Sequence, residues 1–502
     1  MTDATDVTNE PIALERIPSG VRGLDVVFGG GFVRGAVYLV MGRPGTGKTT
    51  LGNQLCFAHV AAGGRAAYVT LLAESHATML KNLQTMSFYD PDIIHRGLSY
   101  VGAYRALRER KLRGLLDMIR QVIAQEQASF LVIDGISPAR MFAESEPALK
   151  EFVVELQTLT GMTNCTTILL ANMTAEDANG PEHTMVDGLV ELGLQRYERG
   201  TIRTVEVLKF RGSAHILGKN EMSITGDGVR AHPRSEEVLS AASRPARSSD
   251  ARVRTGVTGL DPLLGGGLLA GTTSVVLGFA GSGKTTFAAH FLAAGAEDGE
   301  STLLFGFYES PERFLQGAQS VGIDLRKHLL DDKFGHVWQP PYEFTLDQLR
   351  ERLFQEIDRR DVRRLVIDSL DAFRQAAVDP SRTIRFVTAL VNELRVRNVT
   401  TVITDETLKP SGPEMETRVE GISALVENLI LLEYVTQGAS LRRLLFIVKQ
   451  RASNHALSAR EFFLTMRGME VSTDPSSAEE LLRPSDGVGI RPSRRKPLPE
   501  GI

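Results

Sequence analysis

Two stretches of the chain have the residue types and the spacing that bind phosphate. The pattern Gly-x-x-x-x-Gly-Lys-Ser/Thr occurs at 42–49 and again at 278–285, each time after an apolar run and before a helix-like run. Its glycines let backbone N–H groups converge on phosphate oxygens at a helix N-terminus, its lysine contacts the β- and γ-phosphates, and its last hydroxyl binds Mg²⁺. The predicted phosphate-binding residues are Gly42, Gly45, Thr46, Gly47, Lys48, Thr49 and Thr50, and Gly278, Gly281, Ser282, Gly283, Lys284, Thr285 and Thr286.

Asp134 and Asp368 are the candidates to hold Mg²⁺ together with Thr49 and Thr285. Each aspartate ends an apolar run, FLVID in the first half and RLVID in the second. A carboxylate there emerges at the carboxyl edge of a sheet, where it can hold Mg²⁺, usually through water. An aspartate after a buried strand is also a common cap or turn residue, but the phosphate-binding patterns upstream favour the metal role.

The two patterns belong to an internal repeat. Lys48 and Lys284 are separated by 284 − 48 = 236 residues, and Asp134 and Asp368 by 368 − 134 = 234. The stretches GVRGLDVVFGGG and GVTGLDPLLGGG match at the same offset of 256 − 20 = 236. Because the order is kept and the offset is nearly constant, the chain is a tandem duplication of two whole domains.

Short apolar runs alternate with longer helical stretches in both halves. This alternation predicts an α/β fold in which a mostly parallel sheet is covered by helices on both faces. Segments rich in Pro, Ser and charge mark the boundaries. The predicted organisation is a flexible N-terminus at 1–11, a first domain at 12–231, a linker at 232–252, a second domain at 253–472 and a disordered tail at 473–502.

Composition excludes several classes of protein. Among 502 residues, 57 Lys and Arg stand against 61 Asp and Glu, so no basic excess calls for nucleic acid. Cys56 and Cys165 are the only cysteines, too few for a disulfide framework or a Cys-rich zinc site. The polar N-terminus lacks the pattern of a secretory signal, and no apolar run is long enough for a membrane span. We therefore expect a cytoplasmic protein that needs neither membrane nor nucleic acid.

The repeat resembles the RecA-like ATPases, and specifically the double-domain KaiC family. The resemblance covers about 12–473 and rests on the GLD and GGG lead-in before each phosphate loop, the duplication, and the pattern K-x-R-x-x-x-H at 209–215 and 449–455. It implies two tandem RecA-like P-loop NTPase domains, each a mostly parallel sheet flanked by helices. ATP and Mg²⁺ are the implied ligands, and hydrolysis of ATP is the implied activity.

In that family a pair of adjacent glutamates polarises the attacking water. The matching stretches here keep one member of each pair, Glu74 and Glu309, with Ala73 and Tyr308 in the other places. A single carboxylate is enough to orient a water, so the resemblance implies slow hydrolysis with Glu74, Glu309, Lys48 and Lys284 as catalytic residues. The alternative for each glutamate is a surface residue that caps a helix.

The family's late signature places basic residues against the γ-phosphate bound by the neighbouring subunit. Supplying charge in trans in this way requires a closed ring, and the resemblance implies a homo-hexamer. The alternative is one solvated face of a strand. The residues that match the signature are Lys209, Arg211 and His215, and Lys449, Arg451 and His455.

The family's second domain also phosphorylates adjacent Ser and Thr residues of its own chain. The matching positions are Ser423 and Ala424, so one acceptor remains. The resemblance thus implies a serine autokinase activity at Ser423, with a plain turn serine as the alternative.

The function predicted from the sequence is a KaiC-like ring ATPase in signalling or timing, with regulatory proteins as partners. Two rivals stay open: a DNA-associated RecA-type ATPase, and a non-hydrolysing scaffold gated by nucleotide.

Overall fold

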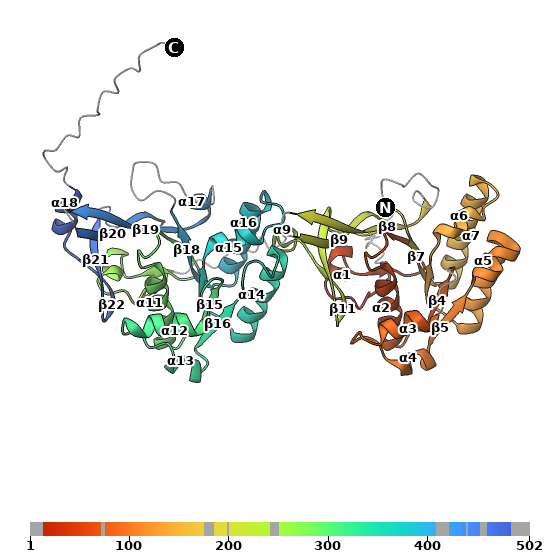
Figure 1. The fold of residues 1–502 in the computed structure, drawn as a ribbon, viewed down its shortest axis with the longest axis horizontal. Helices are drawn as coiled ribbons and strands as arrows, with labels where there is room; N and C mark the ends of the chain where they lie inside the picture. The colour runs from red at the N-terminus through yellow and green to blue at the C-terminus, as the bar shows by residue number, and fades with distance from the viewer. Residues whose placement is uncertain are drawn as a thin grey trace, which may run out of the picture. The chain divides into compact units, whose positions relative to one another are not determined.

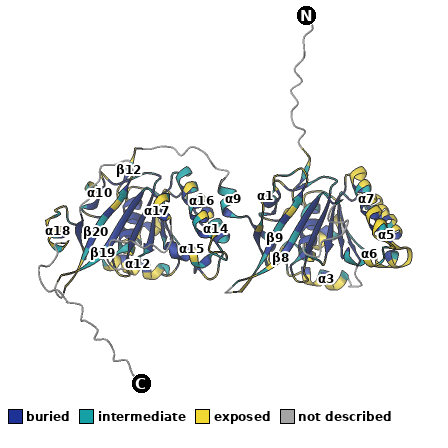
Figure 2. Cartoon of the chain, turned by 90° about the horizontal axis from the view of Figure 1, so that it is seen from above, coloured by how far each residue is buried: buried dark blue, intermediate teal, exposed yellow. Residues whose placement is uncertain are grey.

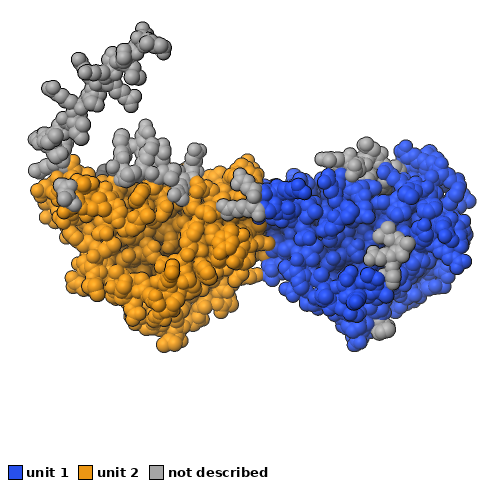
Figure 3. All heavy atoms as spheres, in the orientation of Figure 1, with its two compact units in different colours: residues 1–238 blue, residues 239–502 orange. Residues whose placement is uncertain are grey.

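The computed structural model describes residues 14–71, 76–174, 185–197, 200–240, 250–407, 421–437, 440–451 and 459–482. The chain divides into two compact units, residues 1–238 and 239–502 (Figure 3). Unit 1 and unit 2 are described separately below. Among the described residues, no helix has both the length and the apolar composition that a membrane crossing requires.

Unit 1 is built on one large sheet (Figure 1). Its strands are β3 (Val37–Gly42), β4 (Ala66–Thr70), β5 (Leu98–Gly102), β6 (Phe130–Asp134), β7 (Thr166–Ala171), β8 (Gly188–Tyr197), β9 (Gly200–Phe210), β10 (Lys219–Thr225) and β11 (Gly228–His232). Their order is β11-β10-β9-β8-β3-β7-β6-β4-β5. The strands from β8 to β5 in this order pair in parallel, whereas β8 to β11 pair antiparallel.

Most helices of unit 1 connect the parallel strands, as crossovers between such strands require. These connecting helices are α2 (Lys48–Ala61), α3 (His76–Leu83), α4 (Pro91–Arg96), α5 (Tyr104–Glu126), α6 (Ser137–Met141) and α7 (Glu146–Thr163). Helix α1 (Leu24–Phe28) precedes the first long strand, and α9 (Ser235–Ser240) follows β11 and includes the chain boundary between the units at residues 238 and 239. A small sheet, β1 (Arg16–Ile17) with β2 (Phe32–Val33), precedes the first long strand.

Unit 2 repeats this plan. Its strands are β12 (Arg252–Val253), β13 (Leu268–Leu269), β14 (Thr273–Gly278), β15 (Thr302–Gly306), β16 (Phe334–Trp338), β17 (Arg364–Asp368), β18 (Thr400–Glu406), β19 (Asn428–Gln437), β20 (Ser440–Gln450), β21 (Arg460–Thr465) and β22 (Gly468–Val471). The large sheet has the order β16-β15-β17-β18-β14-β19-β20-β21-β22. Read from the opposite edge, this order matches that of unit 1 strand for strand.

The helices of unit 2 correspond to those of unit 1 in most places. They are α10 (Leu260–Leu263), α11 (Lys284–Glu297), α12 (Pro311–Ser320), α13 (Lys327–Leu330), α14 (Leu346–Arg360), α15 (Leu370–Ala376), α16 (Arg382–Val396), α17 (Ile422–Leu425) and α18 (Ser476–Leu482). The duplication read from the sequence is therefore a duplication of fold.

Each central strand is apolar throughout because it is covered on both faces, and Figure 2 shows these strands buried beneath more exposed helices. Along β3, Tyr38 and Val40 pack in the cluster that includes α2, whereas Val37, Leu39 and Met41 pack in the cluster that includes α5 and α7. Alternate residues of a strand point to opposite faces, so every position of β3 needs an apolar side chain. This arrangement confirms the predicted α/β fold with a mostly parallel sheet between helices.

The predicted disordered tail begins at residue 473, but residues 473–482 have a defined structure, and residues 483–502 lie outside the described part of the chain. Helix α18 forms there, and its Ala478 packs with Leu444 and Ala459. Asp474 accepts hydrogen bonds from both the backbone N–H and the hydroxyl of Ser476, which satisfies donors at the start of the helix. The polar composition of this segment did not predict the buried contact of Ala478 or the cap at Asp474.

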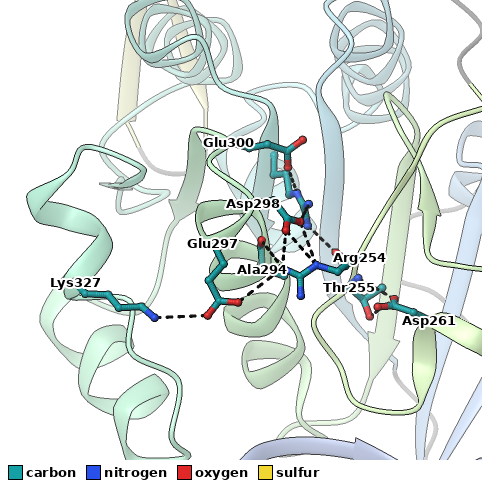
Figure 4. Close-up of polar contacts among 9 residues, drawn as sticks. Arg254, Thr255, Asp261, Ala294, Glu297, Asp298, Glu300 and Lys327 are labelled. Atoms are coloured by element: carbon teal, nitrogen blue, oxygen red, sulfur yellow. Dashed lines mark hydrogen bonds and ion pairs between the residues drawn. The ribbon is translucent and has the colours of Figure 1, made fainter.

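Unit 2 buries a cation at the start of β17. The guanidinium of Arg364 is 1% exposed and donates to Asp298 Oδ2 at 2.9 Å, to the carboxylate of Glu300 and to the carbonyl of Arg254 at 2.6 Å. It also lies 5.3 Å from the centre of the Phe291 ring. Figure 4 shows the side chains of Arg254, Asp298 and Glu300 gathered in this network. Its many partners make the buried charge tolerable.

We predict that Arg364→Met destabilises unit 2 by about 3 kcal/mol, because the two carboxylates lose their buried partner but can be partly rehydrated. Arg363→Met is the matched control, since its side chain is 45% exposed and pairs only with the exposed Asp361, and its cost should stay below about 1 kcal/mol. Denaturant unfolding followed by the fluorescence of Trp338, the single tryptophan, reports on unit 2 alone. Equal stability of the two variants would contradict this account.

Candidate active sites at the phosphate loops

Glycine shapes the loop between the first central strand and its helix in both units. Gly47 has a φ of 101°, and a Cβ there would lie 2.4 Å from Ile224 Cδ1. Gly283 takes the same place in unit 2 with a φ of 106°. This left-handed backbone lets the helices begin at Lys48 and Lys284, with their free N–H groups at the loop. The loops and first helical turns contain all the predicted phosphate-binding residues, from 42 to 50 and from 278 to 286.

Both loop lysines are held by carbonyls of their own loop. Lys48 Nζ donates to Gly42 O at 2.7 Å and to Arg43 O at 3.0 Å. Lys284 Nζ donates to Gly278 O at 2.9 Å and to Phe279 O at 3.0 Å. Burial lowers the pKa of Lys48, and the charge of the nearby Asp134 opposes that shift. Each ammonium is thus positioned beneath the loop before any phosphate binds.

In unit 1 the two predicted metal ligands lie in contact. Thr49 Oγ1 donates to Asp134 Oδ2 at 3.1 Å, and the hydroxyl of Tyr68 donates to the same oxygen at 2.6 Å. Asp134 ends β6 and is 7% exposed. A hydroxyl and a carboxylate are hard oxygen donors of the kind that Mg²⁺ prefers, so the residues present fit this ion.

Unit 2 holds its aspartate from the other side. Asp368 ends β17 and accepts a hydrogen bond from the hydroxyl of Thr404 on β18, the strand next to β17. Leu304 stands where unit 1 has Tyr68, at the offset of 236, and offers no donor. Burial raises the pKa of Asp368, while Thr404 and Lys284 oppose the shift. Both Asp368 and Thr285 line one cavity of about 500 Å³, together with Lys284.

Glu309 lines the same cavity of unit 2. Burial raises its pKa first, and the negative charge of Asp368 raises it further. Glu309 therefore lies close to Asp368, so the structure brings these two predicted site residues together. Its counterpart in unit 1, Glu74, lies outside the described residues.

Lys209 and Arg211 lie away from the phosphate loop of their own unit. Lys209 pairs with Leu189 of β8, whereas Gly42, where the loop begins, is level with Leu192. Three residues of strand separate these levels, about 10 Å at 3.3 Å per residue. Arg211 continues in the same direction, farther from the loop.

Unit 2 shows the same register at its own late signature. Lys449 pairs with Leu429, whereas Gly278 is level with Leu432, and Arg451 follows farther from the loop. The structure therefore does not bring either basic pair to its own phosphate loop. The imidazole of His215 lies 6.4 Å from the ring of Phe210, and His455 lies outside the described residues.

Backbone carbonyls hold the two lysines at the sheet edge, whereas Arg211 Nη1 lies 3.5 Å from Asp187 Oδ1. Lys209 Nζ donates to Val186 O at 2.7 Å, and Lys449 Nζ donates to Val426 O at 2.8 Å and to the carbonyl of Ser423. Burial lowers the pKa of both lysines, and the neighbouring arginine in each unit lowers it further. Ser423 itself is exposed on α17, next to the basic pair of unit 2.

Motif reasoning missed the hydroxyls of Tyr68 and Thr404. Neither residue belongs to a phosphate-binding pattern, and only the pairing of β6 with β4, and of β17 with β18, brings them to the aspartates. The spacing of apolar runs gives no strand order, so no signal in the sequence could have found them.

We predict that Tyr68→Phe weakens Mg²⁺ binding at the first site about 10-fold, because the carboxylate of Asp134 loses the donor that orients it. The test is a Mg²⁺ titration of fluorescent ATP binding in a Lys284→Ala chain, which keeps only the first site. Tyr104→Phe, at a partly exposed tyrosine that begins α5, is the matched control and should change nothing. An unchanged Mg²⁺ midpoint for Tyr68→Phe would show that this hydroxyl serves packing alone.

Comparison with known proteins agrees with this geometry. The family model for the KaiC ATPase matches residues 17–236 and 253–476, one match in each unit. The chain is 26% identical over 477 residues to the circadian clock oscillator protein KaiC of Parathermosynechococcus lividus, covering 92% of this chain and 86% of that protein. It is 25% identical over 494 residues to KaiC of a Picosynechococcus species, with 96% and 94% covered. For KaiC of a Nostoc species the identity is 26% over 480 residues, with 93% and 91% covered.

Because the family model covers both units, and both carry the same fold and phosphate loop, this chain belongs to the KaiC ATPase family and contains two of its ATPase domains.

Proposed function

We propose that the chain forms a closed homo-hexameric ring that binds ATP and Mg²⁺ in both units and hydrolyses ATP at the interfaces between neighbouring copies. The observation that carries this proposal is the position of the basic pairs in both units, at the sheet edge opposite to their own phosphate loops. A cation that cannot reach its own nucleotide can reach that of a neighbour. A heterologous contact repeated from copy to copy builds a ring where its rotation closes, and the proposal is that it closes with six copies.

Nucleotide binding in unit 1 is supported by a cavity of about 850 Å³ that begins at the phosphate loop. Arg43 and Thr46 of the loop line it, and β8 and β9 continue its wall with residues such as Glu191 and Thr204. This volume lies within the range of about 300–1,000 Å³ that is usual for small-molecule sites. The triphosphate would lie at the loop, where Thr49 and Asp134 would hold Mg²⁺ against it and neutralise its charge.

The chain's own residues divide the work of hydrolysis. Lys48 and Lys284 would bind the β- and γ-phosphates, and Glu74 and Glu309 would orient the attacking water. Arg211 and Arg451 of the next copy would stabilise charge on the transferring phosphoryl group. One carboxylate in place of a pair implies slow turnover in both units.

A serine autokinase activity in unit 2 is part of the proposal. Ser423 shares its short helix with Ala424, and the carbonyls of both accept hydrogen bonds from the basic pair, at 3.3 Å in the case of Ala424 and Arg451. These hydrogen bonds place the acceptor hydroxyl beside the proposed trans cations. An interface that brings Arg451 to a neighbour's γ-phosphate would bring Ser423 with it.

A role in signalling or timing is proposed from the relatives, which are named as circadian clock oscillator proteins. The rival is a scaffold that binds nucleotide without hydrolysing it, and Ala73 and Tyr308 in place of carboxylates favour it. An assay of phosphate release from ATP separates the two, since a scaffold releases none.

Mixing two inactive variants tests the trans arrangement. Arg211→Ala chains keep a nucleotide site but lack the trans arginine, and Lys48→Ala chains have the reverse defect. Mixed rings contain some interfaces with both residues intact, so we expect first-unit hydrolysis to recover to about a quarter of the wild-type value at a 1:1 ratio, the statistical share of intact pairs. The measurement is phosphate release in a Lys284→Ala background.

The control is a chain that carries both Arg211→Ala and Lys48→Ala. Mixed with either single variant at any ratio, this chain should restore no hydrolysis. If the mixture also stays inactive while ring formation is confirmed by mass, the arginine acts within its own chain or only structurally.

For Ser423 we expect one slowly formed phosphosite after incubation with ATP and Mg²⁺. Lys284→Ala should abolish it, because the donor nucleotide is bound in unit 2, whereas Lys48→Ala chains that still assemble should retain it. Mass spectrometry of tryptic peptides covering 419–442 measures the occupancy, with Ser423→Ala as the control. Peptides that remain unphosphorylated after long incubation would rule out the autokinase activity and leave the ATPase proposal intact.

A further inference from the structure

One hydrogen bond ties the phosphate loop of unit 2 to a strand outside the loop. The hydroxyl of Tyr434 on β19 donates to the carbonyl of Gly281, in the middle of the loop, at 2.5 Å. The bonds of Lys284 reach only the carbonyls of Gly278 and Phe279, where the loop begins. Tyr434 therefore holds a part of the loop that the lysine does not hold.

The sheet places the Tyr434 side chain at the loop. Strand β19 pairs in parallel with β14, which leads into the loop, and Leu432 is level with Gly278 at the end of β14. Two residues farther along β19, Tyr434 has the same facing as Leu432 and so extends past β14 to the loop. Arg443 lies opposite Tyr434 on β20, and its guanidinium carbon is 5.4 Å from the centre of the tyrosine ring.

This bond fixes the peptide group between Gly281 and Ser282. The carbonyl of this group accepts from Tyr434, and its N–H donates to Phe279 O at 3.1 Å. Because a peptide group is planar, two bonds at its opposite ends set its orientation. A phosphate loop binds through backbone N–H groups, whose directions depend on the orientations of its peptide groups. The loop thus keeps its shape without a bound phosphate to hold it.

Unit 1 closes its loop in a different way. The hydroxyl of Thr46 donates to Arg43 O at 2.9 Å, a bond within the loop itself. The equivalent hydroxyl of Ser282 is buried and has no hydrogen-bond partner in the part of the chain that the structure describes. Leu194 stands where unit 2 has Tyr434, at the strand offset of 434 − 194 = 240, and offers no donor. The bond to β19 is therefore a property of unit 2 and not of the shared fold.

We infer that Tyr434 is a positioning residue of the second nucleotide site, whose hydroxyl keeps the phosphate loop preformed and thereby strengthens phosphate binding and slows nucleotide release. The inference rests on the proposed binding of nucleotide in unit 2. A flexible loop must be ordered when its ligand binds, and this ordering costs affinity, whereas a preformed loop avoids the loss. Because the bond acts on the loop, its effect falls on the phosphates and not on the nucleoside.

The test uses Tyr434→Phe, which removes the hydroxyl and keeps the ring beside Arg443. The parent is the full chain with Lys48→Ala, in which only unit 2 keeps its loop lysine. We expect Tyr434→Phe to raise the Kd of fluorescent ADP about 3- to 10-fold, the worth of one hydrogen bond, and to speed its release by a similar factor. The measurements are an equilibrium titration and a chase with unlabelled ADP.

Pyrophosphate separates a role at the loop from a contact with the nucleoside. Its affinity, measured by competition with fluorescent ADP, should fall by the same factor as that of ADP, because pyrophosphate has no base or ribose. Phosphate release at saturating ATP should not fall, since Lys284 and Glu309 are unchanged. Tyr342→Phe removes the same atom from a tyrosine that is 73% exposed, and it should leave every measurement unchanged.

The reciprocal experiment moves the bond to unit 1, in a Lys284→Ala chain. Leu194 is 46% exposed, and Arg203 lies opposite it as Arg443 lies opposite Tyr434. A Cβ on Gly45, the counterpart of Gly281, would meet no described atom within 4 Å, so there is room for a ring. Leu194→Tyr should release ADP about 3-fold more slowly than Leu194→Phe, which adds the ring without the hydroxyl.

The inference is overturned if Tyr434→Phe binds and releases ADP as its parent does, or if Leu194→Tyr and Leu194→Phe release ADP equally fast. It is also overturned if the affinity for ADP falls while that for pyrophosphate does not, since Tyr434 then contacts the nucleoside. Failure of the proposed function has a different signature. In that case the Lys48→Ala parent would bind no fluorescent ADP, or would still bind it after Lys284→Ala is added.

Discussion

The rest of each unit depends on the hydrogen bonds that hold the lysine ammonium against the carbonyls of its own phosphate loop. Its position requires a strand that ends at a glycine, a left-handed residue before the helix, and a helix that begins at the lysine itself. In unit 1 the loop can take this shape only with glycine at position 47, because a Cβ there would overlap the side chain of Ile224. The sheet, its parallel order and the helices on both faces serve to hold this turn rigidly and to bring one aspartate to its edge.

Within this shared plan the two units satisfy the same demands with different residues. Tyr68 donates a hydrogen bond to Asp134 from β4 in unit 1, whereas Thr404 donates one to the equivalent Asp368 from β18 in unit 2. At the start of the strand that leads to this aspartate, unit 1 has the apolar Phe130, and unit 2 has the buried Arg364. Such exchanges are possible because the fold fixes where a donor is needed but not which neighbouring strand supplies it.

The sheet register places the phosphate loop at one edge of the sheet and the basic pair at the opposite edge. Strands β8 and β9 run from the phosphate loop edge to the opposite edge, so a basic residue late in β9 is about 10 Å of strand away from its own loop. The same separation in unit 2 places Ser423 with Lys449 and Arg451. An exposed hydroxyl and two cations thus gather on the edge opposite to the unit's own phosphate loop, where the proposed ring would place a neighbouring copy.

The sequence by itself determined the duplication and the α/β class, and it predicted the residues of the two phosphate loops and the two aspartates. It could do so because phosphate binding demands fixed residue types at fixed spacing along one continuous segment, and because buried parallel strands must be apolar throughout. It misjudged the residues of α18, where a single buried Ala478 and a cap outweigh a polar composition.

Only the tertiary structure decided which residues surround the aspartates, where the basic pairs lie, and what Tyr308 contacts. Each of these depends on strand order and register, which bring together segments separated by 66 residues for Tyr68 and Asp134 and by 63 for Tyr308 and Asp371. A hydrogen bond across such a distance leaves no periodic trace in the sequence, because any polar side chain with a suitable reach satisfies it. Tyr308 is one example, because its hydrogen bonds with Asp371 and Gln375 exist only where the fold places these residues beside it.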